Sequence, residues 1–380
     1  MLTSDQNRKI NEIVEEFKEA ADFYRMEYSE DLMGMFRDFG CMLLLKCKVD
    51  TEGKADLERL LEGRHKLKGT VKRQLMTVSE ELAQLWAPGE QDGSGDTGEY
   101  EGSQNVREMF QTALEEIFHF CLYSKGGKNR YLLPEETAKP LLRLITLPEG
   151  MMAGNEGLVV LDTQCGAGSV LMAASRYLKN PRLMGYEKDE EMWAAAVIMS
   201  QLSGLEMELH LEDGARADLY ESCDLVISNP VYGTDTIKDE ELIDQLPGEL
   251  KTVRGRYHME LIRGMLALKY DGRAMLIVPN SFLFATRTES IKVRKWLLQS
   301  YSLEAVIALP EDTFLYSGVR SSVMVFSKPF MSGGWEGHTQ RVLYYNLEKQ
   351  EDKEKQQKEY ERLEEVWSQR DSYYGKWERS

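Results

Sequence analysis

Apolar residues recur at helical spacing through the first third of the chain. Thr3 suits an N-cap, with Gln6 three residues later as in a capping box. The apolar positions that follow keep to one helical face: Ile10, Val14, Phe17, Ala21 and Tyr24. Further helices are predicted over 32–46, 55–61, 71–85 and 106–121. Residues 1–125 are therefore predicted to form a helical N-terminal domain, interrupted by an exposed acidic, Gly-rich loop near 88–102.

After residue 125 the pattern changes to short apolar runs that alternate with helical segments. The runs span 158–161, 183–186, 223–228, 274–278, 303–309 and 322–326. Continuous apolar runs are typical of strands covered on both faces, and their alternation with helices predicts an α/β fold over 126–348. Residues 349–380 are predicted to be a charged helical tail. Its apolar stripe either belongs to a solvated end, which we favour, or contacts a partner.

Composition and charge narrow the class of protein. The chain has 380 residues, of which 42% are hydrophobic and 29% charged, as in ordinary globular proteins of about two domains. It has no apolar run of about 18 residues and does not begin like a signal peptide, so we expect no membrane association and a cytoplasmic location. The five cysteines never form CxxC and no HExxH occurs, so reduced thiols and no metal are expected.

A glycine-containing segment follows the first apolar run. Asp162 ends that run, and Gly166 and Gly168 precede a predicted helix, so a ligand can approach bare backbone beside a helix N-terminus. Glu187 ends the next run about 20 residues further on, the spacing at which an acid accepts ribose hydroxyls. Only the GxG part of the phosphate fingerprint is present, but the combination favours a nucleoside cofactor over a structural turn.

The run 223–228 leads into Asn229-Pro230-Val231-Tyr232. This tetrapeptide resembles the (Asn/Asp)-Pro-Pro-(Tyr/Phe) motif of S-adenosylmethionine-dependent amino methyltransferases. An asparagine oxygen and a prolyl carbonyl can accept the two hydrogens of an amide-like amine, and an aromatic ring can stack on the base. The motif therefore indicates methyl transfer to a planar exocyclic nitrogen.

Further segments resemble the modification subunits of type I restriction systems. Gly272 to Phe284, which reads GRAMLIVPNSFLF, is similar to their GGRAAVVLPDGVLF stretch, and Tyr131 to Ala138 resembles FYTPREVA. Three more segments follow the family's order and spacing: 294–298, 303–310 and 318–323. The resemblance covers about 126–347 and implies a Rossmann-like, S-adenosylmethionine-dependent methyltransferase domain behind the helical one.

The resemblance also implies site residues. Those expected to bind the cofactor are Pro134, Asp162, Gly166, Gly168, Glu187 and Asp213. Among them, Glu187 would hold the ribose and Asp213 would lie near the adenine ring. Those expected to hold the target base are Asn229, Pro230 and Tyr232.

The implied reaction is N6-methylation of adenine in DNA, for which the base must be flipped out of the duplex. In the resembled family a separate specificity subunit reads the DNA, and specificity and restriction subunits complete a hetero-oligomer. A formal net charge of −17 agrees with that arrangement, because an acidic protein is poorly suited to hold DNA alone. After the proposed catalytic loop, Lys251, Arg254 and Arg256 form a basic cluster that either contacts phosphate or faces solvent.

Several positions depart from the family pattern. Val231 replaces the second proline of the tetrapeptide, Gln164 and Ala167 differ within the glycine loop, and Leu133 replaces an upstream threonine. Two alternatives therefore stay open. One is a cofactor-binding assembly subunit without catalytic activity, which Val231 favours. The other is a protein-glutamine N-methyltransferase, which uses the same tetrapeptide.

Overall fold

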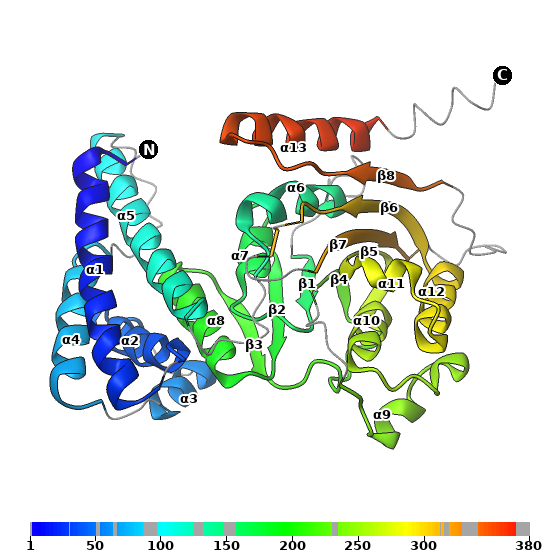
Figure 1. Ribbon diagram of the computed structural model, residues 1–380, viewed down its shortest axis with the longest axis horizontal. Coiled ribbons are helices and arrows are strands. Elements are labelled where there is room, and N and C mark those ends of the chain that lie inside the picture. Colours follow the sequence, from blue (N-terminus) through cyan, green and yellow to red (C-terminus); the bar gives the residue numbers. More distant parts are fainter. Residues whose placement is uncertain are drawn as a thin grey trace. The chain divides into compact units, whose positions relative to one another are not determined.

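The computed structural model describes eleven stretches of the chain: residues 2–29, 31–50, 54–63, 67–86, 97–124, 132–146, 157–229, 235–311, 313–314, 319–328 and 341–369 (Figure 1). Two compact units are present. The first comprises Met1–Arg130 with Asp189–Glu206, and the second Tyr131–Lys188 with Met207–Ser380. In the described part of the chain, every helix is too short or too polar to cross a membrane.

The first unit is helical, as the apolar spacing predicts. Its helices are α1 (Ser4–Glu27), α2 (Met33–Lys46), α3 (Ala55–Gly63), α4 (Gly69–Ala83), α5 (Thr97–Leu122) and α8 (Glu190–Leu202). Thr3 and Gln6 form the expected capping box. The loop predicted near 88–102 lies outside the described residues up to Asp96. The prediction was wrong for the last part of this loop, since α5 already begins at Thr97. A helix stabilised by tertiary packing can include residues whose intrinsic helix propensity is low.

Helix α8 belongs to the helical unit although it connects two strands of the other unit. It is buried along most of its length, and it packs on α2. The two helices approach closely at Gly40 of α2, which has no side chain. A Cβ on Gly40 would lie 2.4 Å from Cδ1 of Ile198, a contact that real Cβ atoms do not make. The chain therefore returns to the helical unit at Asp189, inside the segment that the sequence predicts to be one continuous α/β domain.

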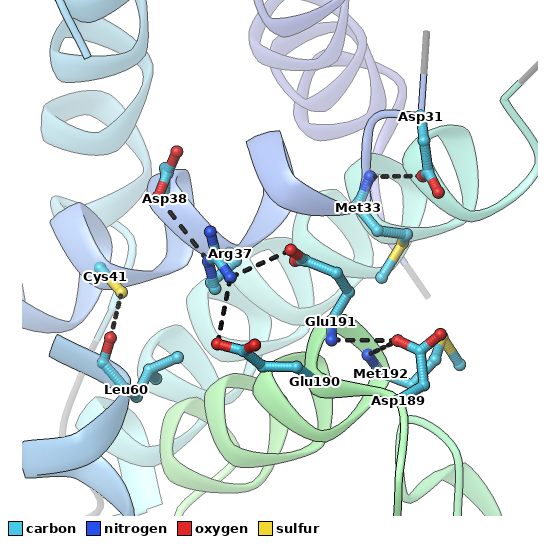
Figure 2. Close-up of polar contacts among 10 residues, drawn as sticks. All are labelled: Asp31, Met33, Arg37, Asp38, Cys41, Leu60, Asp189, Glu190, Glu191 and Met192. Atoms are coloured by element: carbon cyan, nitrogen blue, oxygen red, sulfur yellow. Dashed lines mark hydrogen bonds and ion pairs between the residues drawn. The ribbon is translucent and has the colours of Figure 1, made fainter. Parts of the chain in front are cut away.

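A buried arginine joins α2 to the first turn of α8 (Figure 2). The Nη1 atom of Arg37 lies 3.0 Å from Oε1 of Glu191 and 3.5 Å from Oε1 of Glu190, and Nε lies 3.9 Å from Oδ1 of Asp38. The side chains of Arg37 and Asp38 are only 6% and 1% exposed. Asp189 caps the same turn by accepting hydrogen bonds from the backbone N–H groups of Glu191 and Met192. Charge pairing thus fixes α8 within this unit.

The second unit contains one eight-stranded sheet of order β3-β2-β1-β4-β5-β7-β6-β8. Its strands are β1 (Val159–Asp162), β2 (Arg182–Glu187), β3 (Met207–Leu211), β4 (Cys223–Ser228), β5 (Leu268–Pro279), β6 (Ser302–Ala308), β7 (Ser321–Ser327) and β8 (Leu343–Asn346). The strands from β3 to β5 are parallel, and β7 runs antiparallel to both β5 and β6. The predicted α/β class and all six predicted strands are confirmed; β3 and β8 were not predicted.

The remaining helices of this unit follow the strands or cover the sheet. They are α6 (Glu135–Thr146), α7 (Ser169–Ser175), α9 (Glu240–Asp244), η2 (Gly248–Leu250), α10 (Arg256–Ala267), α11 (Asn280–Phe284), α12 (Thr288–Ser300) and α13 (Lys353–Ser368). The chain order reverses between β1 and β4, since β2 and β3 extend to one side and β4 and β5 to the other. Such a switch point leaves a crevice for ligands at the carboxyl ends of the strands.

The tail forms the predicted helix, α13, but its apolar stripe is covered by this chain. Leu363 and Trp367 are buried, and α13 packs on α6 (Figure 1). Arg143 of α6 forms an ion pair with Glu364. The favoured interpretation, a solvated end, was wrong, because the stripe completes the core beside α6 and its charged residues face outward.

Candidate active site

The glycine loop connects β1 to α7 in a conformation that needs glycine. Gly166 and Gly168 have φ angles of +55° and +76°, in the left-handed region that residues with a Cβ rarely adopt. The backbone N–H of Cys165 donates to the carbonyl of Tyr186 on β2 over 2.9 Å. A Cβ on Gly185 would lie 2.8 Å from Sγ of Cys165. Three glycines therefore let the loop lie close to β2 with its backbone uncovered by side chains.

Glu187 ends β2 and contacts this loop directly. Its Oε2 atom accepts a hydrogen bond from the backbone N–H of Gly166 over 3.0 Å. The structure thus brings together two residues that are 21 positions apart. The carboxylate stands at the edge of the sheet next to bare backbone, which suits the predicted binding of ribose hydroxyls.

Asp162 is the last residue of β1 and is almost fully buried. The pKa of its carboxyl is raised to about 7, mainly by burial and to a smaller extent by the nearby charge of Glu187, against the opposite effect of the backbone N–H of Gln164. That N–H donates to Oδ1 of Asp162 over 3.0 Å. The side-chain Oε1 of Gln164 is buried without a hydrogen-bond partner among the described residues. A buried acceptor that lacks a donor at this position fits a site that a polar ligand completes.

Asn229 follows the last residue of β4 and is half-buried. Asp162 pairs with Ile227 in the sheet register, so Asn229 stands two residues beyond this pair, past the end of β1. It therefore emerges at the same edge as the glycine loop. Pro230 and Tyr232 lie outside the described residues, as does Val231, so their predicted contacts with a base remain predictions.

Asp213 lies two residues beyond β3, and its carboxylate is held by arginine. Oδ2 accepts from Nη1 of Arg256 over 2.8 Å and lies 3.8 Å from Nε of Arg216, while Oδ1 accepts from the N–H of Ala215 over 3.2 Å. A Cβ on Gly214 would lie 2.2 Å from the carbonyl oxygen of Thr163, so the loops after β3 and β1 touch through backbone. Asp213 thus borders the glycine loop, but its oxygens already have donors.

Pro134 precedes α6 and is exposed. Its carbonyl accepts from the N–H groups of Thr137 and Ala138 over 2.9 and 2.8 Å, which makes it the start of the helix. The predicted part of this proline in cofactor binding stays a prediction.

The basic cluster after the catalytic loop is paired with acids of this chain. Arg256 binds Asp213, Nη2 of Arg254 lies 3.6 Å from Oε2 of Glu240, and Nζ of Lys251 lies 3.5 Å from Oδ1 of Asp244. Neither sequence-based interpretation anticipated this pairing. Helical spacing offered a partial clue for Arg256, because it stands four residues before the buried Glu260.

The sheet order, the antiparallel β7 and the acids that end β1 and β2 define the fold of class I S-adenosylmethionine-dependent methyltransferases. A Listeria monocytogenes protein assigned to that class shares the fold with a TM-score of 0.65 and 19% identity, over 95% of this chain and 99% of the other. The chain belongs to the N-6 DNA Methylase family, whose sequence profile matches residues 107–378.

Two relatives of known class support this assignment. The Type II methyltransferase M.BanIII of Aneurinibacillus aneurinilyticus is 29% identical over 50% of this chain and 37% of its own length. The Type I restriction enzyme MjaVII methylase subunit of Methanocaldococcus jannaschii is 23% identical over 72% of this chain and 47% of its own. The chain therefore spans less than half the length of these relatives.

Proposed function

We propose that the chain transfers a methyl group from S-adenosylmethionine to N6 of adenine in DNA. The observation that carries this proposal is the position of Asn229 directly after β4, at the edge where Asp162 and Glu187 end β1 and β2. An amide oxygen can there face a methyl donor held on the glycine loop. Membership of the N-6 DNA Methylase family supports the choice of nitrogen and of acceptor.

The donor set fits the cofactor of this fold. Asp162 and the backbone of Gly166 and Gly168 would hold the methionine end, and Glu187 the ribose. Asp213 would hold the adenine ring, and Pro134 would approach from the start of α6. When bound, S-adenosylmethionine supplies an electrophilic methyl group on a positively charged sulfur. The buried carboxyl of Asp162 would favour that positive charge once it is ionised.

Asn229 and Pro230 would act on the acceptor. The asparagine oxygen and the prolyl carbonyl would accept the two N6 hydrogens, which orients the nitrogen lone pair toward the methyl group, and Tyr232 would stack on the flipped base. The flip costs about a few kcal/mol and must be compensated by these contacts. The chain's contribution to the rate is then mostly one of positioning.

We further propose that the chain is a modification subunit that a separate specificity subunit brings to DNA in the cytoplasm, with a restriction subunit completing the assembly. The relative from M. jannaschii carries the name of such a subunit. The charges support the idea, because the basic cluster that follows β4 is neutralised by Asp213, Glu240 and Asp244, and the formal net charge is −17. This chain therefore offers little charge of its own with which to hold DNA there.

The test is a transfer assay with methyl-labelled S-adenosylmethionine. The chain, alone and with a specificity subunit, is incubated with DNA that lacks adenine methylation or with glutamine-containing protein acceptors, and the products are hydrolysed and separated. We expect label in N6-methyladenine only. Asn229→Ala should lower transfer about 10²- to 10³-fold, the usual effect of removing one positioned polar group from a transition state.

Asn7→Ala is the matched control, because Asn7 lies on exposed α1 and bonds only local carbonyls there. It should transfer methyl groups at the rate of the unmodified chain. Label in methylglutamine would support the protein-methylating alternative. Cofactor binding without transfer to either acceptor would support the assembly alternative and overturn the proposal.

A further inference from the structure

One guanidinium stands between two acids at the carboxyl edge of the sheet. The Nη1 atom of Arg256, on the first turn of α10, lies 2.8 Å from Oδ2 of Asp213 and 3.7 Å from Oε1 of Glu260. The first distance is a hydrogen bond and the second is longer than one. Arg256 is therefore shared unequally, and its stronger contact is with Asp213.

Glu260 is the less satisfied of the two acids. Its side chain is 3% exposed, and Oε2 is buried without a hydrogen-bond partner among the described residues. Burial raises its pKa to about 7; the charges that face it are those of Lys188 and Arg256, which lower the pKa, and Asp213, which raises it. A buried carboxylate attracts the nearest cation strongly, because an uncompensated charge in the interior is costly. Glu260 thus attracts both Lys188 and Arg256, and for Arg256 it competes with Asp213.

Arg256 weakens Asp213 as an acceptor for a further donor. Ala215 donates to Oδ1 and Arg256 to Oδ2, and Nε of Arg216 lies 3.8 Å from Oδ2. A carboxylate oxygen can accept more than one hydrogen bond, but a guanidinium that binds Oδ2 fixes the direction of this oxygen and offsets part of its charge. An acid that is to accept a hydrogen bond from the amino group of an adenine ring must have an oxygen directed at that ring. The contact between Gly214 and Thr163 places this acid beside the glycine loop, within reach of a cofactor held there.

We propose that Glu260 is a positioning residue for cofactor recognition, which draws Arg256 away from Asp213 and so frees Oδ2 for the amino group of the cofactor's adenine. The inference rests on the proposed role of Asp213. It adds that adenine recognition depends on two residues, Arg256 and Glu260, that do not contact the cofactor, and that they act in opposite directions.

The test measures how strongly the full chain prefers S-adenosylhomocysteine to S-inosylhomocysteine, which carries an oxo group where adenine has its amino group. Calorimetric Kd values are taken at pH 8, above the pKa of Glu260. Glu260→Gln should lower the preference about fivefold, since Arg256 then stays on Asp213, and Arg256→Gln should raise it by a similar factor, on the scale of part of one charged hydrogen bond. Arg254→Gln, which alters a neighbouring arginine paired with Glu240, should leave the preference unchanged.

The opposite signs separate a positioning role from a structural one. If both variants shift the preference in the same direction, or neither does, the proposal is overturned, and thermal unfolding shows whether each variant is folded. Asp213→Asn distinguishes the two levels of the argument. A lost preference in this variant, with no opposed effects at Glu260 and Arg256, leaves Asp213 in its role and rejects only the inference. An unchanged preference in Asp213→Asn rejects both.

Discussion

Each unit of the molecule holds an arginine between acids, and the two arginines differ in how deeply they are buried: the side chain of Arg37 is 6% exposed and that of Arg256 is 23% exposed. In the helical unit, Arg37 reaches Glu191 at 3.0 Å and lies against Asp38 and Glu190, which come from the two helices it joins (Figure 2). In the sheet unit, Arg256 binds Asp213 at 2.8 Å and stands 3.7 Å from Glu260. Glu191 and Glu260 each keep one buried oxygen without a hydrogen-bond partner among the described residues.

This difference suggests which of the two arginines can change its partner. The acids around Arg37 come from two packed helices, and moving the guanidinium away from them would leave buried charges uncompensated. We therefore expect the Arg37 cluster to contribute to the free energy of unfolding. Arg256 lies between two acids at the carboxyl edge of the sheet, and our proposal is that it can shift from Asp213 toward Glu260. Substitutions in the first cluster should therefore change the free energy of unfolding, and those in the second should change ligand binding.

The largest effect is expected from Arg37→Met. Removing one partner of a buried charge pair leaves Asp38 and Glu191 uncompensated, which should lower the free energy of unfolding by about 3–5 kcal/mol in urea titrations. Arg8→Met is the control: Arg8 is 72% exposed and pairs with Asp5 and Glu12 at 3.5 and 3.8 Å, so its loss should cost about 0.5 kcal/mol or less. A loss as small for Arg37→Met would remove the contrast between the clusters.

The next effect concerns Gly214, where the two loops of the binding edge touch. Gly214→Ala places a methyl group 2.2 Å from the carbonyl oxygen of Thr163, so the loops must separate. Overpacking of this kind costs about 1–3 kcal/mol, and S-adenosylhomocysteine should bind about tenfold more weakly. Gly248→Ala, with no atom within 4 Å of the added Cβ, should bind normally. Equal affinity of Gly214→Ala and Gly248→Ala for S-adenosylhomocysteine would show that binding does not depend on the close approach of Gly214 to Thr163.

The position of a strand in the sheet, at its edge or in its interior, explains which strands could be predicted. The six predicted strands carry continuous apolar runs, and all six lie in the interior of the sheet. The two missed strands, β3 and β8, are the outermost ones, and most of their side chains are half-buried or exposed. An edge strand is paired on one side only, so its sequence need not be apolar throughout, and a search for apolar runs passes over it.

The common location of three candidate site residues at one edge of the sheet was predictable, because each of them ends or follows a predicted strand. Asp162, Glu187 and Asn229 meet at one edge because the carboxyl ends of parallel strands lie together. The link between Arg256 and Asp213 was not predictable, since 43 residues separate them and only the packing of α10 beside the loop after β3 joins them. A motif is also interpreted without its neighbours in space. The motif therefore assigns the cofactor's adenine to Asp213 and does not show that Arg256 binds the same carboxylate.

The pH dependence of cofactor affinity tests the edge directly. Burial first, and then the Glu187 charge, raise the pKa of Asp162 to about 7, so below that pH the carboxyl is neutral. A positively charged ligand favours the ionised form, and S-adenosylmethionine should bind about eightfold more tightly at pH 7.5 than at pH 6. Calorimetry at the two pH values measures the ratio of the Kd values. In Asp162→Asn this ratio should fall to the part that other titrating groups contribute. A wild-type affinity independent of pH would show that Asp162 does not face the ligand's charge.

The effect of Glu260→Gln on stability has the opposite sign to that of Arg37→Met. Burial raises the pKa of Glu260 to about 7 in the folded chain, against about 4.3 when unfolded, so the stability that its proton provides is present below pH 4 and is lost as the pH rises through 7. Glutamine carries no such cost. The variant should therefore gain on the wild type between pH 5 and pH 8, by about 2–3 kcal/mol in urea titrations. Glu241→Gln, on exposed α9, should show no such trend. If Glu260→Gln instead loses stability at pH 8, Arg256 and Glu260 form a stabilising pair like that of Arg37 and Glu191, and the two clusters are of one kind.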